Sequence, residues 1–433
     1  MKLTVFQAGK GDSILISIGK HLILADGGTG DAYRQFVAPS LAKLAKQDRR
    51  LDLVYVSHSD DDHIGGIVQL LRDLVEWRIH DYQKGHGNPG HEKPEWERPP
   101  EIKEVWNNGF SEMVGENSGP LVEALGTCAR NLLLLRTGNA LQESMEFSNL
   151  AASVTQAIEL TRRIGPDFLD IRLNVPFNGD LMYVTDPPTM VSYGKLQVRI
   201  IGPFKEDLKV YRDFWNKWLK DPKNKPGIVS MREKTDRDKK RLYGEMAQSP
   251  LKMLMTSAKV LGNRKSVTPP NLASTMLLLK EGKKTVIMAG DGHSDDILGG
   301  LGACGMLSAS GGCHVDVLKV PHHGSEHNAT AEFPKQVTAE HYVFCGNGFR
   351  GNPELAVLRA FLDSRMGPTG KRSANPETGR PFTFWFNTSP KATKPQYKKH
   401  IEKVQKLIKD AQAKSGGQFK GYFLDKPSFD LDL

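Results

Sequence analysis

A short polar run that follows an apolar segment constrains this chain more than any other feature. Leu53 to Ser57 is apolar and bounded by charge, as expected for a buried strand, and His58-Ser59-Asp60-Asp61-Asp62-His63 follows it directly. A strand end and a tight turn can point several of these side chains into one volume, where carboxylates and imidazoles together bind divalent metals. Gly65 and Gly66 allow the next helix to begin close against this loop. The run therefore predicts a metal site, because solvation alone does not explain so many adjacent charges.

Other predicted strands also end at polar residues. Leu22 to Ala25 ends at Asp26, and Thr285 to Ala289 leads into Gly290-Asp291. A third strand, Val315 to Val320, leads to Pro321-His322-His323-Gly324-Ser325. In open α/β sheets the loops after such strand ends converge on one crevice. We expect these polar residues to meet the 58 to 63 run there.

These motifs resemble those of a known superfamily. Residues 57 to 66 resemble the HxHxDH motif of the metallo-β-lactamase superfamily, and most of all the HxDxDHxGG form in the hydrolase domain of ComEC-type DNA-uptake proteins. Four other segments resemble that family's elements in the family's order, over residues 1 to 75 and 190 to 360: Gly9-Lys10-Gly11-Asp12-Ser13, Leu24-Ala25-Asp26-Gly27-Gly28, Gly290-Asp291, and Val320-Pro321-His322-His323-Gly324-Ser325.

The resemblance implies an α/β fold, the four-layer αββα metallo-β-lactamase sandwich. Residues 1–75 would form the first half of the core and residues 188–363 the second half. Between them, residues 76–187 read as a largely helical and loop-like insertion over the active site, with a helix predicted over Gly119 to Arg136. Residues 364–433 read as a basic C-terminal extension.

The resemblance also implies a site with two divalent metal ions. His58 and Asp60 would hold the first ion, Asp62 and His63 the second, Asp291 would bridge the two, and His322 would complete the second site. Asp62, Asp291 and His323 form the implied catalytic set. Two roles fit His323: contact with the substrate or its leaving group, or orientation of His322. Asp26 and Asp12 are expected to fix the metal loop by hydrogen bonds rather than to bind metal.

Two departures from the family pattern bear on the metal and the substrate. The superfamily usually has a further histidine where this chain reads Asn271-Leu272-Ala273-Ser274. The first site is then richer in oxygen, which moves the expected metal from zinc alone toward manganese, with magnesium as a third candidate. Asn271 and Ser274, with His323 and Ser325, are the residues expected to face substrate. Asn352-Pro353 replaces the family's His-Pro, so no ligand is assigned there.

Composition favours an anionic partner. The chain has 59 Lys and Arg against 50 Asp and Glu, a formal net charge of +9. Basic stretches at Lys217 to Lys225, Lys234 to Arg241 and Lys391 to Lys414 fit either a phosphate-binding path or a solvated surface, with Tyr397 available to stack on a base. Apolar runs fall short of the roughly 20 residues of a membrane span, and no signal peptide is recognisable, so we expect a cytoplasmic protein without membrane contact.

The leading functional hypothesis is a metal-dependent hydrolase, specifically a two-metal phosphodiesterase or nuclease acting on DNA or RNA. Its charge and the ComEC-like motif favour nucleic acid as substrate. A stand-alone nuclease of this kind would suit a regulated antiphage-defence effector restrained by a partner protein. Two rivals remain: a small-molecule hydrolase acting on a lactone, thioester or cyclic nucleotide, and a catalytically silent binding module.

Overall fold

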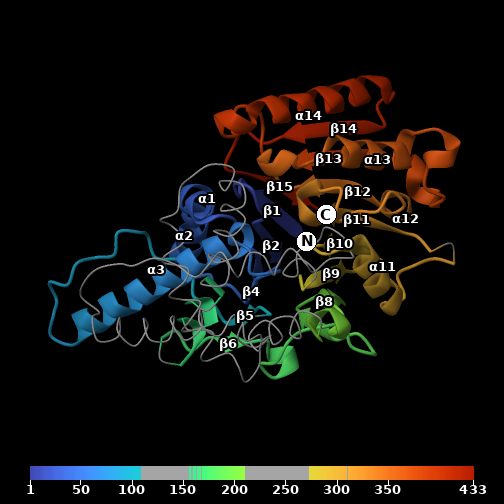
Figure 1. Cartoon of the computed structure of the whole chain (residues 1–433). Helices are drawn as coiled ribbons and strands as arrows, with labels where there is room; N and C mark the ends of the chain where they lie inside the picture. The colour runs from blue at the N-terminus through green and yellow to red at the C-terminus, as the bar shows by residue number, and fades with distance from the viewer. Residues whose placement is uncertain (109–155, 158, 162, 167, 210–272, 310) are drawn as a thin grey trace, which may run out of the picture.

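The computed structural model describes residues 1–108, 156–157, 159–161, 163–166, 168–209, 273–309 and 311–433. Within these ranges two β-sheets face each other, and helices lie on the outer side of each sheet (Figure 1). Several features predicted from the sequence lie outside the described residues. They are the helix over Gly119 to Arg136, the residue Asn271, and the basic stretches at 217–225 and 234–241. None of the helices in the described ranges combines the length and apolar character needed to cross a membrane.

The first sheet has the strand order β15-β1-β2-β3-β4-β5-β6. Its strands are β1 (Lys2–Phe6), β2 (Ile14–Ile18), β3 (His21–Ala25), β4 (Leu53–Tyr55), β5 (Glu104–Trp106), β6 (Arg172–Leu173) and β15 (Ser428–Asp432). Its helices are α1 (Gly30–Ala32), which continues through a π-helical turn into α2 (Ala38–Lys46), and the long α3 (Asp61–Gly85). Apolar residues of α2 and α3 pack with those of the sheet in one buried cluster that includes Leu41, Val54, Ile64, Ile67 and Leu71.

The second sheet has the order β14-β13-β12-β11-β10-β9-β8-β7. Its strands are β7 (Met190–Tyr193), β8 (Leu196–Gly202), β9 (Met276–Glu281), β10 (Lys284–Met288), β11 (Cys313–Lys319), β12 (Val337–Phe344), β13 (Phe382–Phe386) and β14 (Phe419–Phe423). A second buried cluster joins this sheet to α11 (Ser294–Ala303), α12 (Phe333–Gln336), α13 (Leu355–Met366) and α14 (Pro395–Lys414).

A third apolar cluster fills the space between the two sheets. It joins residues of the first sheet, such as Val5 and Ile16, to residues of the second, such as Leu277 and Val317. The layers therefore run helix, sheet, sheet, helix, and the αββα sandwich expected from the sequence is confirmed.

The basic C-terminal segment, residues 364–433, adds strands to both sheets. The sequence analysis interpreted this segment as an extension and did not predict these strands. β13 and β14 continue the second sheet in parallel beyond β12, and β15 pairs antiparallel with β1 of the first sheet. The reason lies in alternating aromatics: Phe382, Phe384 and Phe386 point into the core, whereas the basic residues nearby stay at the surface. This segment closes one edge of each sheet.

Close contact between glycines fixes the start of α3. A Cβ on Gly66 would lie 2.0 Å from the carbonyl oxygen of Gly27, and one on Gly27 would lie 2.5 Å from the backbone nitrogen of Ile67. The amide of Gly27 donates to the carbonyl of His63 at 2.8 Å, and that of Gly66 to the carbonyl of Gly28 at 2.8 Å. Only residues without a side chain permit this approach. The contact holds the His63 backbone beside the end of β3.

We predict that Gly66→Ala destabilises the protein, because neither backbone segment can move aside without displacing α3. The expected loss is about 1–3 kcal/mol of unfolding free energy, as for other overpacked sites. Urea unfolding followed by circular dichroism measures it. Gly85→Ala, at the far end of the same helix and with no atom within 4 Å of the added Cβ, is the matched control and should leave stability nearly unchanged. Equal stability of the two variants would contradict this account of the contact.

Candidate metal centre

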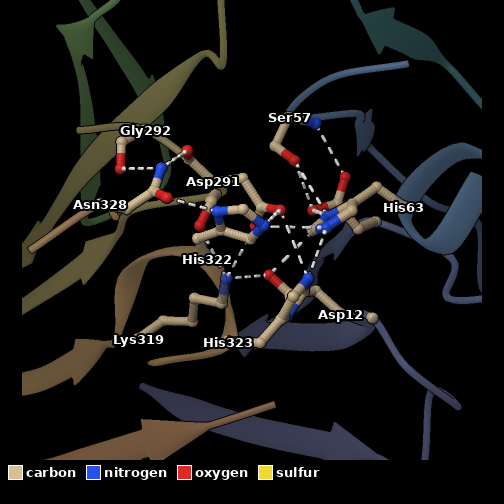
Figure 2. Close-up of polar contacts among 12 residues, drawn as sticks. Asp12, Ser57, His63, Asp291, Gly292, Lys319, His322, His323 and Asn328 are labelled. Carbon is tan, nitrogen blue, oxygen red and sulfur yellow. Dashed lines mark hydrogen bonds and ion pairs between the residues drawn. The ribbon is translucent and has the colours of Figure 1, made fainter. Parts of the chain in front are cut away.

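Three polar residues of the cluster each lie three residues after the end of a strand. His58 lies three residues after β4, Asp291 three after β10 and His322 three after β11. Because β3 pairs in parallel with β4, and β10 with β11, these carboxyl ends meet at one edge of the sandwich. Asp26 directly follows β3, and Asp12 lies in the turn before β2. The segments predicted to converge do so (Figure 2).

Asp291 lies at the middle of the cluster, and its side chain is almost completely buried. Four imidazoles surround its carboxylate. The Nε2 atoms of His58 and His322 lie 3.7 and 3.6 Å from Oδ2, His323 Nε2 lies 3.3 Å from the same oxygen, and His63 Nε2 lies 3.3 Å from Oδ1. A carboxylate with ring nitrogens on both oxygens has the arrangement that a bridging ligand between two cations requires.

The remaining carboxylates divide between two groups of histidines. Asp60 Oδ2 lies 3.7 Å from His58 Nε2. Asp62 Oδ2 lies 3.5 Å from His323 Nε2, which is 3.4 Å from His63 Nε2. One ligand atom each from Asp12, His63, Asp291 and His323 lie within 4.8 Å of one another. The geometry thus offers two adjacent ligand groups that share Asp291.

The roles of the paired histidines differ from those that the resemblance implied. His323, not His322, lies beside Asp62 and His63, while His322 approaches the Asp291 oxygen that His58 also approaches. The backbone explains the difference. His322 and His323 both have left-handed φ values, of 45° and 56°, which turn both rings toward Asp291. His323 therefore belongs to the ligand group instead of standing behind His322.

Three of the four rings are hydrogen-bonded through their other nitrogen, and the fourth, His323, has an ion-pair contact with Asp12 there. His63 Nδ1 lies 2.9 Å from Asp26 Oδ2, His323 Nδ1 lies 3.3 Å from Asp12 Oδ1, and His58 Nδ1 lies 3.1 Å from Ser57 Oγ. His322 Nδ1 contacts the side-chain oxygen of Asn328, whose Nδ2 donates to the Asp291 carbonyl at 2.8 Å. Such partners fix the ring orientation and leave Nε2 as the ligand atom. Asp26 lies where an orienting partner of His63 would lie, whereas Asp12 also offers a ligand atom to the group of His63, Asp291 and His323, so the orienting role of Asp12 stays a prediction.

Lys319 is a buried cation beneath the cluster, and the sequence reading missed it. Its side chain is 1% exposed, Nζ contacts Asp12 Oδ2 and lies 3.7 Å from Asp291 Oδ1, and it donates to the Gly290 carbonyl at 2.8 Å (Figure 2). Burial opposes its charge, but the carboxylates of Asp12 and Asp291 raise the pKa of Lys319 above its usual value. One feature of the sequence could have revealed this residue: it is a lysine inside a mostly apolar strand, three residues before a histidine pair.

The ionisation of the cluster is strongly perturbed. Burial opposes ionisation of Asp12, yet Lys319 and the imidazoles lower the pKa of Asp12 to about 2. Burial also opposes ionisation of Asp62 and Asp291, but neighbouring positive charges hold the pKa values of both well below the usual range. Burial disfavours charged imidazoles, but the carboxylates, Asp291 foremost, raise the pKa values of His63 and His323 well above normal. Without metal, the raised pKa values of His63 and His323 favour protons on these two rings, opposite the carboxylates.

The donor set fits two divalent cations. His58 Nε2 and Asp291 Oδ1 are buried without a hydrogen-bond partner among the described residues, a costly state unless another group is bound there. Lys319 supplies one positive charge and two divalent ions would supply four, which together balance five carboxylates: Asp12, Asp26, Asp60, Asp62 and Asp291. Imidazole nitrogen and carboxylate oxygen suit zinc and manganese.

Two predicted substrate-facing residues can be placed. Ser325 is buried, and its Oγ accepts a hydrogen bond from the His327 amide at 3.4 Å, so it caps the turn after the histidine pair. Ser274 is also buried, and its Oγ has no hydrogen-bond partner within the described ranges. Its side chain lies next to Gly290, one residue before the central carboxylate. Both side chains are buried, so contact of either residue with substrate stays a prediction.

Comparison with known proteins identifies the first part of the chain. Residues 7–129 match the family model described as the metallo-beta-lactamase superfamily. Competence protein ComA of Neisseria gonorrhoeae is 32% identical over 120 residues, which are 25% of this chain and only 17% of that protein. The chain thus corresponds to a small part of that relative's length.

Two solved structures overlap this chain loosely. Zn²⁺-bound PqqB from Methylobacterium extorquens gives a TM-score of 0.33 at 10% identity, covering 100% of both chains. The short form of human tRNase Z gives 0.30 at 11% identity, covering 79% of this chain and 91% of that one. The family-model match includes the run from His58 to His63, whose loop contributes to the centre around Asp291. Residues 7–129 are therefore similar to the metallo-beta-lactamase superfamily, and the described residues fold as an αββα sandwich.

Proposed function

We propose that this protein is a two-metal phosphodiesterase that hydrolyses nucleic acid. One observation carries the proposal: the buried carboxylate of Asp291 lies between two groups of ligands, each containing imidazole nitrogen and a further carboxylate. Two cations bound there would lower the pKa of a water between them and stabilise charge on the attacking and leaving oxygens of a phosphodiester.

The protein's own residues hold this arrangement rigid. Asp26, Ser57, Asp12 and Asn328 fix the four rings, so that each Nε2 stays directed at the centre. Lys319 keeps Asp12 ionised and contacts Asp291 from below, which limits the movement of both carboxylates. A preorganised centre of this kind needs little rearrangement when charge develops on the reacting phosphate.

Three observations favour nucleic acid as substrate over a lactone or thioester. The carboxylates present in both ligand groups suit divalent ions that also bind phosphate. The formal net charge of +9 favours a polyanion. The segment similar to a competence protein and the ComEC-like motif point the same way. The small-molecule alternative predicts turnover of lactones, thioesters or cyclic nucleotides without turnover of DNA or RNA.

Replacing the bridging carboxylate tests the proposal. We predict that Asp291→Asn lowers kcat on a labelled oligonucleotide in Mn²⁺ by about 10³-fold or more, since a loss of several kcal/mol of charge stabilisation is expected. Asp295→Asn, four residues further along and 61% exposed, is the matched control and should keep wild-type activity. Circular dichroism should show both variants folded.

Nearly wild-type hydrolysis by Asp291→Asn would refute the role given to this residue. If wild-type protein cleaves small esters or lactones and leaves DNA and RNA intact in Mn²⁺ and Zn²⁺ alike, the small-molecule reading replaces the present one.

Metal binding should reverse the pH dependence of stability. In the metal-free protein, the raised pKa values of His63 and His323 stabilise the fold below the unfolded value of 6.5, and this stabilisation is lost as pH rises through the folded pKa values. Metal ions need neutral imidazoles, so they bind better as pH rises. We predict that Tm falls between pH 6.5 and 9 in EDTA and rises over the same range with Mn²⁺ or Zn²⁺. Differential scanning fluorimetry measures both curves, and parallel curves would contradict a metal centre built on these histidines.

A further inference from the structure

A cavity of about 470 Å³ lies beside the metal centre, within the usual size range of small-molecule sites. Several separate parts of the chain line it, among them Asp61 at the start of α3. The turn before β2 and the start of α1 form one wall, the loop after β12 forms another, and the segment that leads into α14 forms the third. Residues that matter for its chemistry are Lys10, Asp31, Asp61, Phe349, Lys394 and Tyr397.

The cavity shares a wall with the metal centre. Asp61 lines the cavity, while its chain neighbours Asp60 and Asp62 belong to the ligand groups. Lys10 lines the cavity two residues before Asp12, and its Nζ lies 3.6 Å from Asp61 Oδ2. The cavity therefore borders the loop that carries two of the proposed ligands.

The walls are fixed before any ligand arrives. Asn387 Nδ2 donates to the carbonyls of Phe6 and Gly11 at 3.3 and 3.4 Å, and its Oδ1 accepts from the Gly346 amide at 2.9 Å. A Cβ on Gly11 would lie 1.7 Å from the Asp62 carbonyl oxygen, so the turn packs directly against the start of α3. A preformed site loses less entropy on binding.

Two aromatic rings from different elements face the cavity. Phe349 and Tyr397 have ring centroids 6.0 Å apart at an interplanar angle of 78°, and Lys10 Nζ lies 5.2 Å from the centre of the Phe349 ring. Both rings are partly exposed. Aromatic side chains beside a polar groove are the platform on which unpaired bases stack.

The charges of the cavity are balanced. Lys10 and Lys394 bring two positive charges, while Asp31 and Asp61 bring two negative ones. This balance does not favour a phosphate, which the neighbouring metal centre would hold instead. It suits an uncharged planar group whose edge carries hydrogen-bond donors and acceptors, which describes a nucleobase.

We propose that this cavity binds the base next to the scissile phosphate, and that the protein therefore prefers single-stranded nucleic acid. The inference rests on the proposed phosphodiesterase function and names the form of its substrate. A base paired within a duplex cannot enter a walled cavity unless it is unpaired and unstacked, which costs a few kcal/mol. A single strand can supply its base without that cost.

Binding measured without metal separates this proposal from catalysis. In EDTA, where no cleavage is expected, fluorescence anisotropy of a labelled single-stranded oligonucleotide gives Kd for each variant. We predict that Tyr397→Ala raises Kd about tenfold, within the range found for loss of one stacked base. Tyr397→Phe keeps the ring and should bind within about twofold of wild type. Tyr422→Ala, which removes a 46% exposed tyrosine from β14 outside the cavity, is the control and should not change Kd.

Four results decide between the outcomes. Unchanged Kd in Tyr397→Ala and in the double variant Phe349→Ala/Tyr397→Ala would overturn the proposal, as would equal affinity for a duplex of the same sequence. Loss of binding in Tyr397→Ala with recovery in Tyr397→Phe supports it, and thermal unfolding would confirm that both are folded. If the variants behave as predicted but wild type cleaves no phosphodiester in any divalent metal, the proposed function fails while the base site stands.

Discussion

Five carboxylates in one small volume, three of them buried and two partly exposed, are the constraint around which this site is built. Like charges repel strongly at low dielectric, so such a group is stable only when opposite charges neutralise it. Lys319 provides one such charge permanently, through Asp12 and Asp291. The rest must come from protonated imidazoles or from cations, and the raised pKa values of His63 and His323 show that the metal-free site takes up protons. Proton uptake and metal uptake are therefore alternatives at one site.

The fold supplies this volume by placing strand ends from both sheets at one edge. His58 comes from the first sheet, whereas Asp291 and His322 come from the second. The apolar cluster between the sheets fixes their separation, and the glycine contact between Gly27 and Gly66 fixes the start of α3 against β3. The C-terminal segment adds strands to both sheets and supplies Tyr397 and Lys394 to the adjacent cavity. One segment thus contributes both to the core and to the proposed base site.

Sequence patterns predicted the parts of the site that are local in the chain. Three local predictions are confirmed, because each depends on a few neighbouring residues. They are the apolar strand before His58, the close packing of the two glycines after His63, and the strand that leads to Asp291. The separate positions of His322 and His323 were not predicted, since they depend on left-handed backbone at these two adjacent residues. Asn328 and Lys319 act through partners distant in sequence, which no local pattern reveals. The strands beyond Ser364 escaped notice because basic residues mask their alternating aromatics.

Metal stoichiometry tests the central claim most directly. Protein purified without chelator, dialysed against metal-free buffer at neutral pH and measured by inductively coupled plasma mass spectrometry should retain close to two divalent ions per chain, the number that together with Lys319 balances the five carboxylates. A content that stays well below one ion per chain, even after incubation with Mn²⁺ or Zn²⁺ at neutral pH, would contradict the account.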